Sequence, residues 1–501
     1  MTLADDRALE RFPSHDPATG EILETWPVDD ETTVGEAVDR ARLAALWWEE
    51  LGYEGRRERL LAWKGVITRR MRELAQLMHR ENGKPIADAT LEIIATIDHL
   101  DWAAKHAKKT LGPRSVRPSL LSANQQAILE YQPLGVVGVI GPWNYPVFTP
   151  MGSIAYALAA GNAVVFKPSE LTPGIGAWLV RMFGEVVPEH PVLQLVTGDG
   201  RTGSALARAG VNKISFTGSE RTGKKVMAAC AETLTPVLME CGGKDAMIVD
   251  ADADLAAAAD AAAWGGMANA GQTCVGIERV YVVDSVRDAF LEHLRAELDG
   301  VRAGSDADAS YGPITMPSQV DVIRSHVDDG LARGGTAALG GAASVGDRFV
   351  GPVILTDVPE DSPAVSEETF GPVIVVNRVR DADEAVERAN ASGYGLGGAV
   401  FAKKRGVELA RKMRSGMTSV NSMGSFAFVP ALPFGGVGSS GFGRIHGADG
   451  LREFSRPKAI TRQRFPLPTP LTTFHRKQRD LDLVIKVVTA IHGRRGKLHD
   501  R

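Results

Sequence analysis

The sequence Gly135-Val136-Val137-Gly138-Val139-Ile140 predicts a short β-strand that is buried on both faces, because its apolar residues run without a charged interruption. The stretches 163–167 and 213–216 have the same character, and the stretches 176–186 and 203–209 between them are typical of helices. Strands that alternate with helices form βαβ units around a parallel sheet. The sequence therefore predicts an α/β fold.

A second group of strands and helices follows after about residue 243. The apolar runs 280–283 and 373–376 predict strands, and the stretches 286–299 and 382–390 predict the helices that follow them. We expect this group to form a second α/β domain.

Length, charge and N-terminal sequence exclude several classes of protein. The chain has 501 residues, of which 24% are charged, and its formal net charge is −4. Nucleic-acid-binding proteins usually carry a basic surface, so no nucleic-acid partner is predicted. Residues 1–11 lack the apolar core of a signal peptide, and no run of about 18 apolar residues occurs, so the expected location is the cytoplasm.

The chain contains three cysteines: Cys230, Cys241 and Cys274. They form no CxxC pair and the histidines are scattered, so no metal site is predicted. Cys274 lies in the stretch 269–276, where glycines on both sides let backbone and ligand approach closely. A thiolate there would be a strong nucleophile if a dipole or a positive charge lowers its pKa. The alternative is an inert buried cysteine, which is our interpretation of Cys230 and Cys241.

Two other side chains are candidates for the same chemistry. Glu240 ends the strand-like run 236–239 and precedes Gly242 and Gly243, so it can reach into a cleft and act as a general base. The alternative is a surface or capping carboxylate. Asn144 lies between two prolines that fix the backbone, so its amide can donate to a developing oxyanion. The alternative is a simple turn.

Two glycine-containing stretches resemble phosphate-binding sequences. The stretch 197–203 matches GxGxxG by letter, but a lone match is weak, and a loop that turns into a helix explains it as well. The stretch 218–224 nearly matches a P-loop, but Lys225 stands where that loop needs Ser or Thr to hold magnesium. Because this stretch follows a strand and opens a helix, its N–H groups, with Ser219 as the cap, suit a pyrophosphate.

The stretch Lys167-Pro168-Ser169-Glu170 also follows a buried strand. Its lysine and glutamate can hold ribose hydroxyls, and the carboxylate would repel a 2′-phosphate, which favours NAD over NADP. The alternative is a strand end followed by a helix cap.

Seven motifs occur in one order along the chain. They are Pro142-Trp143-Asn144, Lys167-Pro168-Ser169-Glu170, Phe216-Thr217-Gly218-Ser219, Glu240-Cys241-Gly242-Gly243-Lys244, Gly271-Gln272-Thr273-Cys274, Glu367-Glu368-Thr369-Phe370-Gly371-Pro372 and Pro433-Phe434-Gly435-Gly436. Together they resemble the aldehyde dehydrogenase superfamily, from about residue 16 to residue 454. The stretch 432–441, with His446-Gly447, is similar to class 3 and fatty aldehyde dehydrogenases and to bacterial succinate-semialdehyde dehydrogenases. The family commonly has Leu in place of Cys241 and Ser-Pro in place of Asp245-Ala246, and we expect neither departure to touch the chemistry.

The resemblance implies NAD-dependent oxidation of an aldehyde to a carboxylic acid, with NADP possible, through a cysteine thiohemiacetal and thioester. Cys274 is implied as the nucleophile, Glu240 as the base for hydrolysis, and Asn144 with the Cys274 N–H as the oxyanion hole. The implied cofactor residues are Trp143, Lys167, Ser169, Glu170, Gly218, Ser219, Glu368 and Phe370. The implied substrate residues are Tyr145, Phe148, Thr273, Val275, Phe428 and Phe434. The alternatives are a CoA-acylating relative, against which Glu240 argues, and a catalytically silent structural relative, against which the intact catalytic set argues.

The resemblance also implies a Rossmann-like NAD-binding domain, a catalytic α/β domain and a small β oligomerisation arm. Residues 10–116 and 133–243 form the first, residues 244–445 the second, and residues 117–132 and 446–472 the arm. The arm implies a homodimer or a homotetramer.

The tail, residues 473–501, has apolar residues at helical spacing among many basic ones. These apolar residues are Leu481, Val484, Ile485, Val488 and Ile491. A basic amphipathic helix can lie on a membrane surface, so peripheral membrane association is one prediction. The alternative is packing against a neighbouring subunit or the enzyme's own body.

Overall fold

The structure is a computed structural model that describes residues 10–467 and 472–493. The rest of the predicted arm and tail, including the basic residues 494, 495 and 497, lies outside the described residues, as does most of the N-terminal stretch. The chain divides into two compact units. Unit 1 comprises Met1–Leu111 and Gln132–Arg456, and unit 2 comprises Gly112–Tyr131 and Pro457–Arg501.

The first sheet of unit 1 has the strand order β17-β9-β8-β5-β6-β7. Its strands are β5 (Val136–Ile140), β6 (Ala163–Lys167), β7 (Leu193–Leu195), β8 (Lys213–Gly218), β9 (Val237–Cys241) and β17 (Gly441–Phe442). All neighbours pair in parallel except β17, which pairs antiparallel with β9. Every residue of β5 and β6 is buried, as the continuous apolar runs predict.

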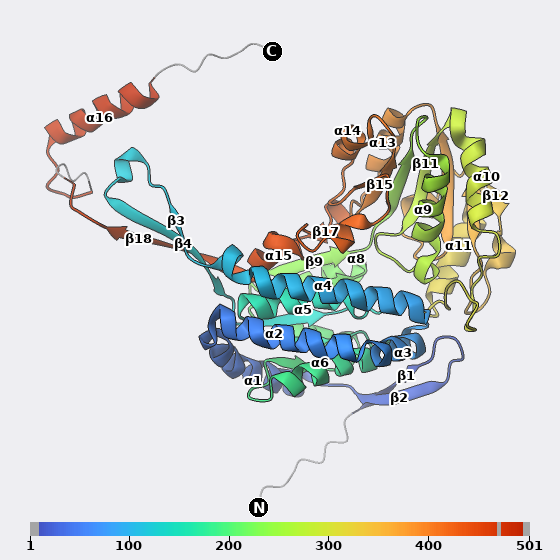
Figure 1. Cartoon of the computed structure of the whole chain (residues 1–501), viewed down its shortest axis with the longest axis horizontal. Coiled ribbons are helices and arrows are strands. Elements are labelled where there is room, and N and C mark those ends of the chain that lie inside the picture. Colours follow the sequence, from blue (N-terminus) through green and yellow to red (C-terminus); the bar gives the residue numbers. More distant parts are fainter. Residues whose placement is uncertain (1–9, 468–471, 494–501) are drawn as a thin grey trace, which may run out of the picture. The chain divides into compact units, whose positions relative to one another are not determined.

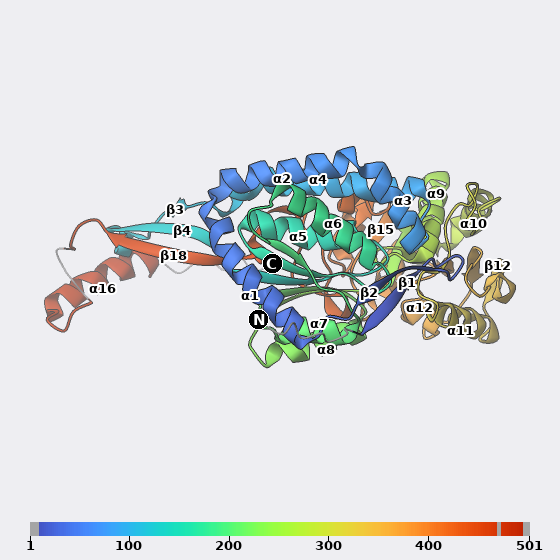
Figure 2. The same ribbon diagram turned by 90° about the horizontal axis from the view of Figure 1, so that it is seen from below.

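Helices cover both faces of this sheet (Figure 2). The helices α5 (Phe148–Ala160) and α6 (Pro173–Val186) lie on one face, and α7 (Gly200–Arg208) and α8 (Glu220–Ala231) lie on the other. The N-terminal part adds β1 (Arg11–His15), β2 (Ile22–Pro27), α1 (Glu31–Glu50), α2 (Gly52–Arg69), α3 (Met71–Asn82) and α4 (Ile86–Leu111). The predicted α/β fold with a parallel sheet is therefore confirmed.

The second sheet of unit 1 has the order β12-β13-β14-β11-β10-β15-β16 (Figure 1). Its strands are β10 (Asp245–Val249), β11 (Ile277–Val283), β12 (Thr336–Leu339), β13 (Val353–Thr356), β14 (Val373–Val379), β15 (Gly398–Phe401) and β16 (Ser419–Val420). One apolar cluster packs it against α9 (Leu255–Met267), α10 (Arg287–Glu297) and α11 (Gln319–Ala332), and another packs it against α13 (Ala382–Asn390) and α14 (Gly406–Lys412). The short helices α12 (Pro363–Ser366) and α15 (Gly447–Glu453) complete the unit.

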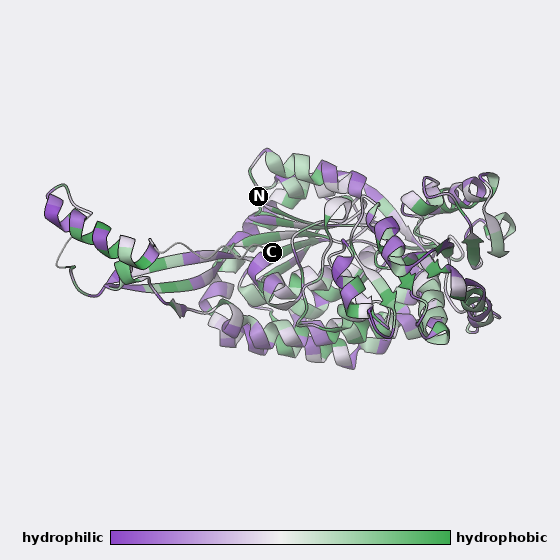
Figure 3. Ribbon diagram, turned by 90° about the horizontal axis from the view of Figure 1, so that it is seen from above, coloured by the Kyte–Doolittle hydropathy of each residue, from purple (hydrophilic) through white to green (hydrophobic). Residues whose placement is uncertain are grey.

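The described part of unit 2 contains a three-stranded sheet of order β18-β4-β3, the short 3₁₀-helix Leu120–Ser122 and one α-helix. Its elements are β3 (Arg114–Val116), β4 (Gln125–Pro133), β18 (Ser455–Gln463) and α16 (Gln478–His492). Strand β3 pairs antiparallel with β4, and β3 ends at Val116, before the first residue of the predicted arm segment 117–132. No residue of α16 is buried, and polar and apolar residues alternate along it (Figure 3). Among the described residues, no helix combines the length and apolarity needed to cross a bilayer.

Candidate active site

One cavity of unit 1 contains both Cys274 and Glu240. The predicted substrate residues line it as well: Tyr145, Phe148, Thr273, Val275, Phe428 and Phe434. Further apolar wall comes from residues that no sequence motif marks: Leu91, Ala95, Trp264, Met423 and Ile445. Of the lining residues, Leu91, Trp264 and Phe428 are 51%, 46% and 54% exposed. Apolar side chains therefore extend from the cavity to the solvent.

Cys274 and Glu240 are neighbours in this cavity. Sγ of Cys274 lies 4.0 Å from Oε1 of Glu240. The carboxyl group of Glu240 is buried near the end of β9, and its Oε2 has no hydrogen-bond partner among the described residues. Burial raises the pKa of Glu240 to about 8. This carboxyl group is placed to exchange a proton with the thiol, or with a water molecule that reaches Oε2.

The surroundings of Cys274 differ from those that a lowered thiol pKa requires. Burial raises the pKa of Cys274 well above its usual value, and the carboxyl groups of Glu240, Asp245 and Glu368 raise it further. The N–H of Val275 lowers the thiol pKa, but it is the smallest of these effects. The expected positive charge does not dominate here, and the thiol stays protonated until a base takes its proton.

Asp245 contradicts the expectation that the departures from the family pattern lie away from the chemistry. It begins β10 and is buried, and its Oδ1 accepts the N–H of Gly397 at 3.0 Å. Burial raises its pKa to about 7. Since its charge raises the thiol pKa of Cys274, the acidic side chain acts on the site electrostatically. Cys230 and Cys241 are buried, and burial raises the pKa of their thiols to about 11 and about 12, which suits inert residues.

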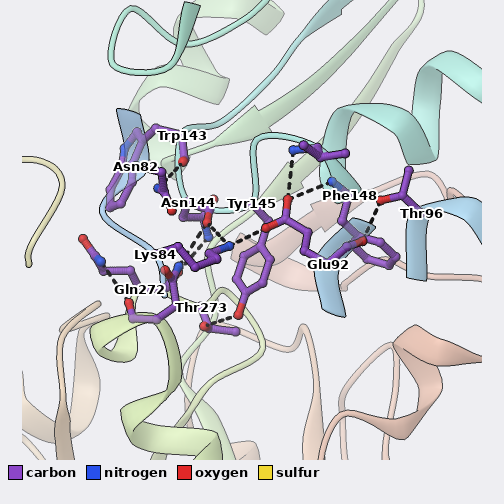
Figure 4. Close-up of polar contacts among 12 residues, drawn as sticks. Asn82, Lys84, Glu92, Thr96, Trp143, Asn144, Tyr145, Phe148, Gln272 and Thr273 are labelled. Carbon is purple, nitrogen blue, oxygen red and sulfur yellow. Dashed lines mark hydrogen bonds and ion pairs between the residues drawn. The ribbon is translucent and has the colours of Figure 1, made fainter. Parts of the chain in front are cut away.

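Asn144 lies in the loop between β5 and α5 (Figure 4). Its Nδ2 donates to the carbonyl oxygen of Gln272 at 2.9 Å, which ties it to the segment that carries Cys274. Its own carbonyl oxygen accepts from Lys84 Nζ and from Asn269 Nδ2, each at 3.0 Å. Asn144 is buried and is not among the residues that line the cavity. One hydrogen of the amide is thus committed to Gln272, and the second remains for another acceptor.

Lys84 and Glu92 are site residues that the sequence did not reveal. They form an ion pair whose side chains are each 1% exposed. Both also line the cavity, and Lys84 Nζ lies 3.8 Å from the centre of the Tyr145 ring (Figure 4). No motif surrounds them, because a lysine before a helix and a glutamate within it are usually solvated. Only the approach of α4 to the loop after β5 buries them.

A second pocket of unit 1 lies near the carboxyl ends of β5, β6 and β8, where Ile140, Lys167 and Phe216 line it. Residues from α7 and α8 form its sides: Gly200, Gly203, Ser204, Thr222, Lys225 and Val226. In this sheet β6 lies on one side of β5 and β8 lies on the other, so the order in which the chain adds strands reverses at β5. Open parallel sheets bind nucleotides at such a switch point.

The predicted cofactor residues near this pocket differ in their positions. Lys167 ends β6 and is buried, and its Nζ donates to the carbonyl oxygen of Pro168 at 2.9 Å and lies 3.7 Å from Glu170 Oε2. Ser219 caps α8, and its Oγ accepts the N–H of Thr222 at 3.4 Å. Of the eight predicted cofactor residues, Lys167 lines the pocket and the other seven do not: Trp143, Ser169, Glu170, Gly218, Ser219, Glu368 and Phe370.

The two phosphate-like stretches form loop-to-helix turns. Asp199 caps α7 and accepts the N–H of Arg201, so the stretch 197–203 is a loop that turns into a helix, which is the alternative to a dinucleotide fingerprint. Two of its glycines, Gly200 and Gly203, nevertheless line the second pocket.

Glu368 approaches the glycines that follow Glu240, and Phe370 contacts Trp143. Oε1 of Glu368 accepts the N–H of Gly243 at 2.9 Å, and burial raises the pKa of Glu368 to about 8. A Cβ atom on Gly242 would lie 2.1 Å from a Glu368 carboxyl oxygen, so any other residue there would displace that carboxyl group. The ring of Phe370 contacts Trp143 edge to face, with centroids 5.5 Å apart. Together with the second pocket, this arrangement fits a dinucleotide.

Comparisons with known proteins agree with this geometry. A model of the aldehyde dehydrogenase family matches residues 4–460. The chain is 36% identical over 456 residues to 4,4′-diapolycopene aldehyde oxidase from Methylomonas sp., which covers 90% of this chain and 86% of the relative. A crystal structure of NAD-dependent aldehyde dehydrogenase from Sinorhizobium meliloti matches with a TM-score of 0.87 and 33% identity, over 93% of each chain. NADP-dependent glyceraldehyde-3-phosphate dehydrogenase from Bacillus halodurans C-125, complexed with NADP, matches with a TM-score of 0.86 and 30% identity, over 91% of this chain and 96% of that one. The chain therefore belongs to the aldehyde dehydrogenase family.

Proposed function

We propose that this chain oxidises an uncharged aldehyde to a carboxylic acid, with Cys274 as the nucleophile. The observation that carries the proposal is the 4.0 Å separation between Cys274 Sγ and Glu240 Oε1 in one largely apolar cavity. Sγ attacks the aldehyde carbon and forms a thiohemiacetal. Loss of a hydride from that carbon leaves a thioester on Cys274, and water then releases the acid and restores the thiol. When bound, NAD(P) accepts the hydride.

Glu240 handles protons at both stages of the reaction. It takes the thiol proton as Sγ attacks and releases that proton to solvent, and the carboxylate then takes a proton from the water that attacks the thioester. Its unpartnered Oε2 supports this role, because it leaves one carboxyl oxygen for a water molecule. A base for water next to the thioester favours hydrolysis over transfer of the acyl group to CoA.

Asn144 and the backbone N–H of Cys274 stabilise the oxygen that becomes negative during the attack. Support comes from the amide of Asn144, which donates one hydrogen to Gln272 and has a second to offer. An oxyanion donor of this kind raises kcat by a factor of about 10²–10³.

We assign the cofactor residues to different parts of the dinucleotide. Lys167 and Glu170 hold the adenosine ribose, and Ser169 supports their turn. Trp143, Gly218 and Ser219 lie against the pyrophosphate, Glu368 binds the nicotinamide ribose, and Phe370 contacts the ring. The carboxylate of Glu170 repels a 2′-phosphate, which favours NAD over NADP. The ratio of kcat/KM for the two cofactors, in wild type and in Glu170→Gln, tests this preference.

The charges in the cavity wall favour an aliphatic or aromatic aldehyde over an acidic one. Lys84 is the one cationic side chain among the lining residues, and its charge is balanced by Glu92. Asp88 also lines the cavity, so a carboxylate on the aldehyde substrate would meet negative charge.

A panel of aldehydes tests both parts of this proposal. We expect a higher kcat/KM for hexanal, decanal and benzaldehyde than for succinate semialdehyde, and Asp88→Asn should narrow that difference. Cys274→Ala should lose turnover and keep NAD binding. Steady-state oxidation by Cys274→Ala would refute the nucleophile, whereas a wild-type preference for succinate semialdehyde would refute only the substrate class.

We also propose that the sheet of unit 2 joins copies of the chain into a homodimer or homotetramer, and that this assembly lies in the cytoplasm. Light scattering tests the oligomeric state. For α16, peripheral membrane contact is the alternative to packing against a neighbouring copy. Its exposed apolar residues support both: Leu483, Ile485, Val487 and Ile491. Co-sedimentation with anionic vesicles should be compared for the full chain and a chain that ends before Thr473. Equal pelleting of the two would contradict membrane contact.

A further inference from the structure

Two buried lysine–glutamate ion pairs lie next to the candidate site, and the proposed chemistry uses neither. Lys84 and Glu92 are each 1% exposed, while Lys244 and Glu278 lie 2.5 Å apart and are 0% and 5% exposed. Removing two charges from water costs free energy, which a buried pair recovers only when further hydrogen bonds satisfy both partners. The groups that supply those further bonds therefore indicate what each pair holds in place.

The first pair binds the loop that carries Asn144 (Figure 4). Lys84 Nζ donates to the carbonyl oxygen of Asn144 at 3.0 Å. Oε1 of Glu92 accepts the N–H groups of Val147 at 2.9 Å and Phe148 at 3.0 Å. One ion pair thus holds the loop at the proposed oxyanion donor and again where α5 begins.

The second pair binds the segment that follows Glu368. Lys244 Nζ donates to Oγ1 of Thr369 at 3.0 Å. Glu278 accepts the N–H of Thr369 at 2.8 Å and that of Phe370 at 3.0 Å. Phe370 has a φ of 51°, a conformation that residues other than glycine rarely adopt. The bonds to Glu278 hold this strained backbone in place.

We infer that these pairs are two separate positioning devices: Lys84–Glu92 places the Asn144 amide, and Lys244–Glu278 places Glu368 and Phe370 for the cofactor. The inference rests on the proposed function, because that function assigns roles to the two loops. A buried ion pair is by itself weak evidence for stability, whereas a carboxylate that accepts two successive N–H groups fixes a loop in one geometry. A displacement of about 1 Å in a catalytic group lowers the rate by about 10²-fold.

Two matched variants, Glu92→Gln and Glu278→Gln, test the inference. Each removes one buried charge. One oxygen of Glu92 accepts both N–H groups, so the glutamine can keep both bonds, whereas Thr369 and Phe370 donate to different oxygens of Glu278, so the glutamine there keeps an acceptor for only one of them. In Glu92→Gln we expect kcat to fall about 10²-fold, while the dissociation constant of NAD stays within about twofold of wild type. In Glu278→Gln we expect the NAD dissociation constant to rise about tenfold or more, as when other orienting partners are removed.

Alkylation of Cys274 by iodoacetamide, measured without cofactor, provides a readout that needs neither oxyanion donor nor NAD. Its rate should match wild type in both variants. The inference is overturned if both variants change kcat and the NAD dissociation constant to the same extent. It is also overturned if they only lower the melting temperature.

If a glutamine variant does not fold, Glu92→Asp and Glu278→Asp test the same division of effects, because aspartate keeps the charge and withdraws the acceptor by one methylene. Failure of the proposed function is distinguishable from failure of this inference. A wild-type enzyme that oxidises no aldehyde would refute the function, whereas NAD binding by Glu278→Gln is measured without any aldehyde.

Discussion

Sγ of Cys274 lies 4.0 Å from Oε1 of Glu240, and burial raises the pKa of both groups. At neutral pH the thiol is therefore protonated, and most of the carboxyl is protonated as well. The proposed nucleophile and the proposed base each become active only when a proton leaves this pair. The rate of turnover should therefore depend on pH, and a variant of Glu240 should separate formation of the thioester from its hydrolysis.

The first prediction concerns hydrolysis of the thioester. In Glu240→Gln the water loses its base, so steady-state turnover should fall by about 10²–10⁴-fold. Rapid mixing with NAD and aldehyde should still give a burst of NADH that approaches one equivalent per active site, but the burst should form more slowly than in wild type because the thiol has also lost its base. Acid quench followed by mass spectrometry should find the acyl group on Cys274. Absence of both burst and acyl enzyme would place the role of Glu240 in the attack itself.

The second prediction concerns the pH profile. The pKa of Glu240 is raised to about 8, and a general base acts in its deprotonated form, so kcat should rise with pH. The rise should be about tenfold per pH unit below that pKa and should level off above it. Steady-state rates in overlapping buffers measure this limb, and Glu240→Gln should lose it. A flat wild-type profile between about pH 6 and about pH 9 would contradict the assignment.

The third prediction concerns Asp245. Its pKa is raised to about 7, so above that pH its charge opposes ionisation of the Cys274 thiol. Asp245→Asn keeps an oxygen for the N–H of Gly397 and removes the charge. At about pH 8, alkylation of Cys274 by iodoacetamide should be faster by about two- to tenfold, which corresponds to a shift of up to one pKa unit. Cys274→Ala shows how much labelling occurs elsewhere, and an unchanged rate would count against the electrostatic effect.

The fourth prediction concerns acid stability. The rings of His446 and His99 lie 3.8 Å apart between centroids, and both nitrogens of His446 lack hydrogen-bond partners among the described residues. Burial lowers the pKa of His446 well below its usual value and that of His99 to about 4. Because both are depressed below the unfolded value of about 6.5, the stabilisation is complete above that pH and is lost as the pH falls towards 4.

His446→Leu removes one of these titrating groups and costs no hydrogen bond. Between about pH 7 and about pH 5, its free energy of unfolding should fall by about 1–2 kcal/mol less than that of wild type. Urea unfolding at the two pH values measures the difference. Buried carboxyl groups with raised pKa values, such as Glu81, shift both proteins alike, so parallel losses in the two would show that His446 does not contribute.

Much of the fold follows from local sequence. The stretch 135–140 has to be a buried strand, because uninterrupted apolar residues satisfy both faces of a parallel sheet and leave no polar face for water. The alternation of such runs with helices then limits the topology, since the crossovers between parallel strands share one hand. The ends of elements follow less directly from the sequence: β3 (Arg114–Val116) lies outside the segment 117–132 that the resemblance assigns to the arm.

The candidate site was less predictable from the sequence. The motifs marked Cys274, Glu240 and Asn144, because unusual residues stood beside glycines and prolines. They did not mark Lys84, Glu92 or Glu278, since an isolated charged residue carries no sign that it will be buried. Nor did they predict the pKa of Cys274, because burial of the thiol and the nearby carboxyl groups of Glu240 and Asp245, which raise that pKa, arise only when the elements pack.

The sequence alone indicated which segments form strands and helices, and which side chains are candidates for a thioester pathway, because both properties depend on neighbours along the chain. The tertiary structure decided which charges lose their water, which of them pair, and how acidic the nucleophile is. Desolvation and Coulomb interactions depend on distances in space. Packing of the elements brings together residues that are far apart in the chain, such as Glu92 and Phe148, or Asp245 and Cys274.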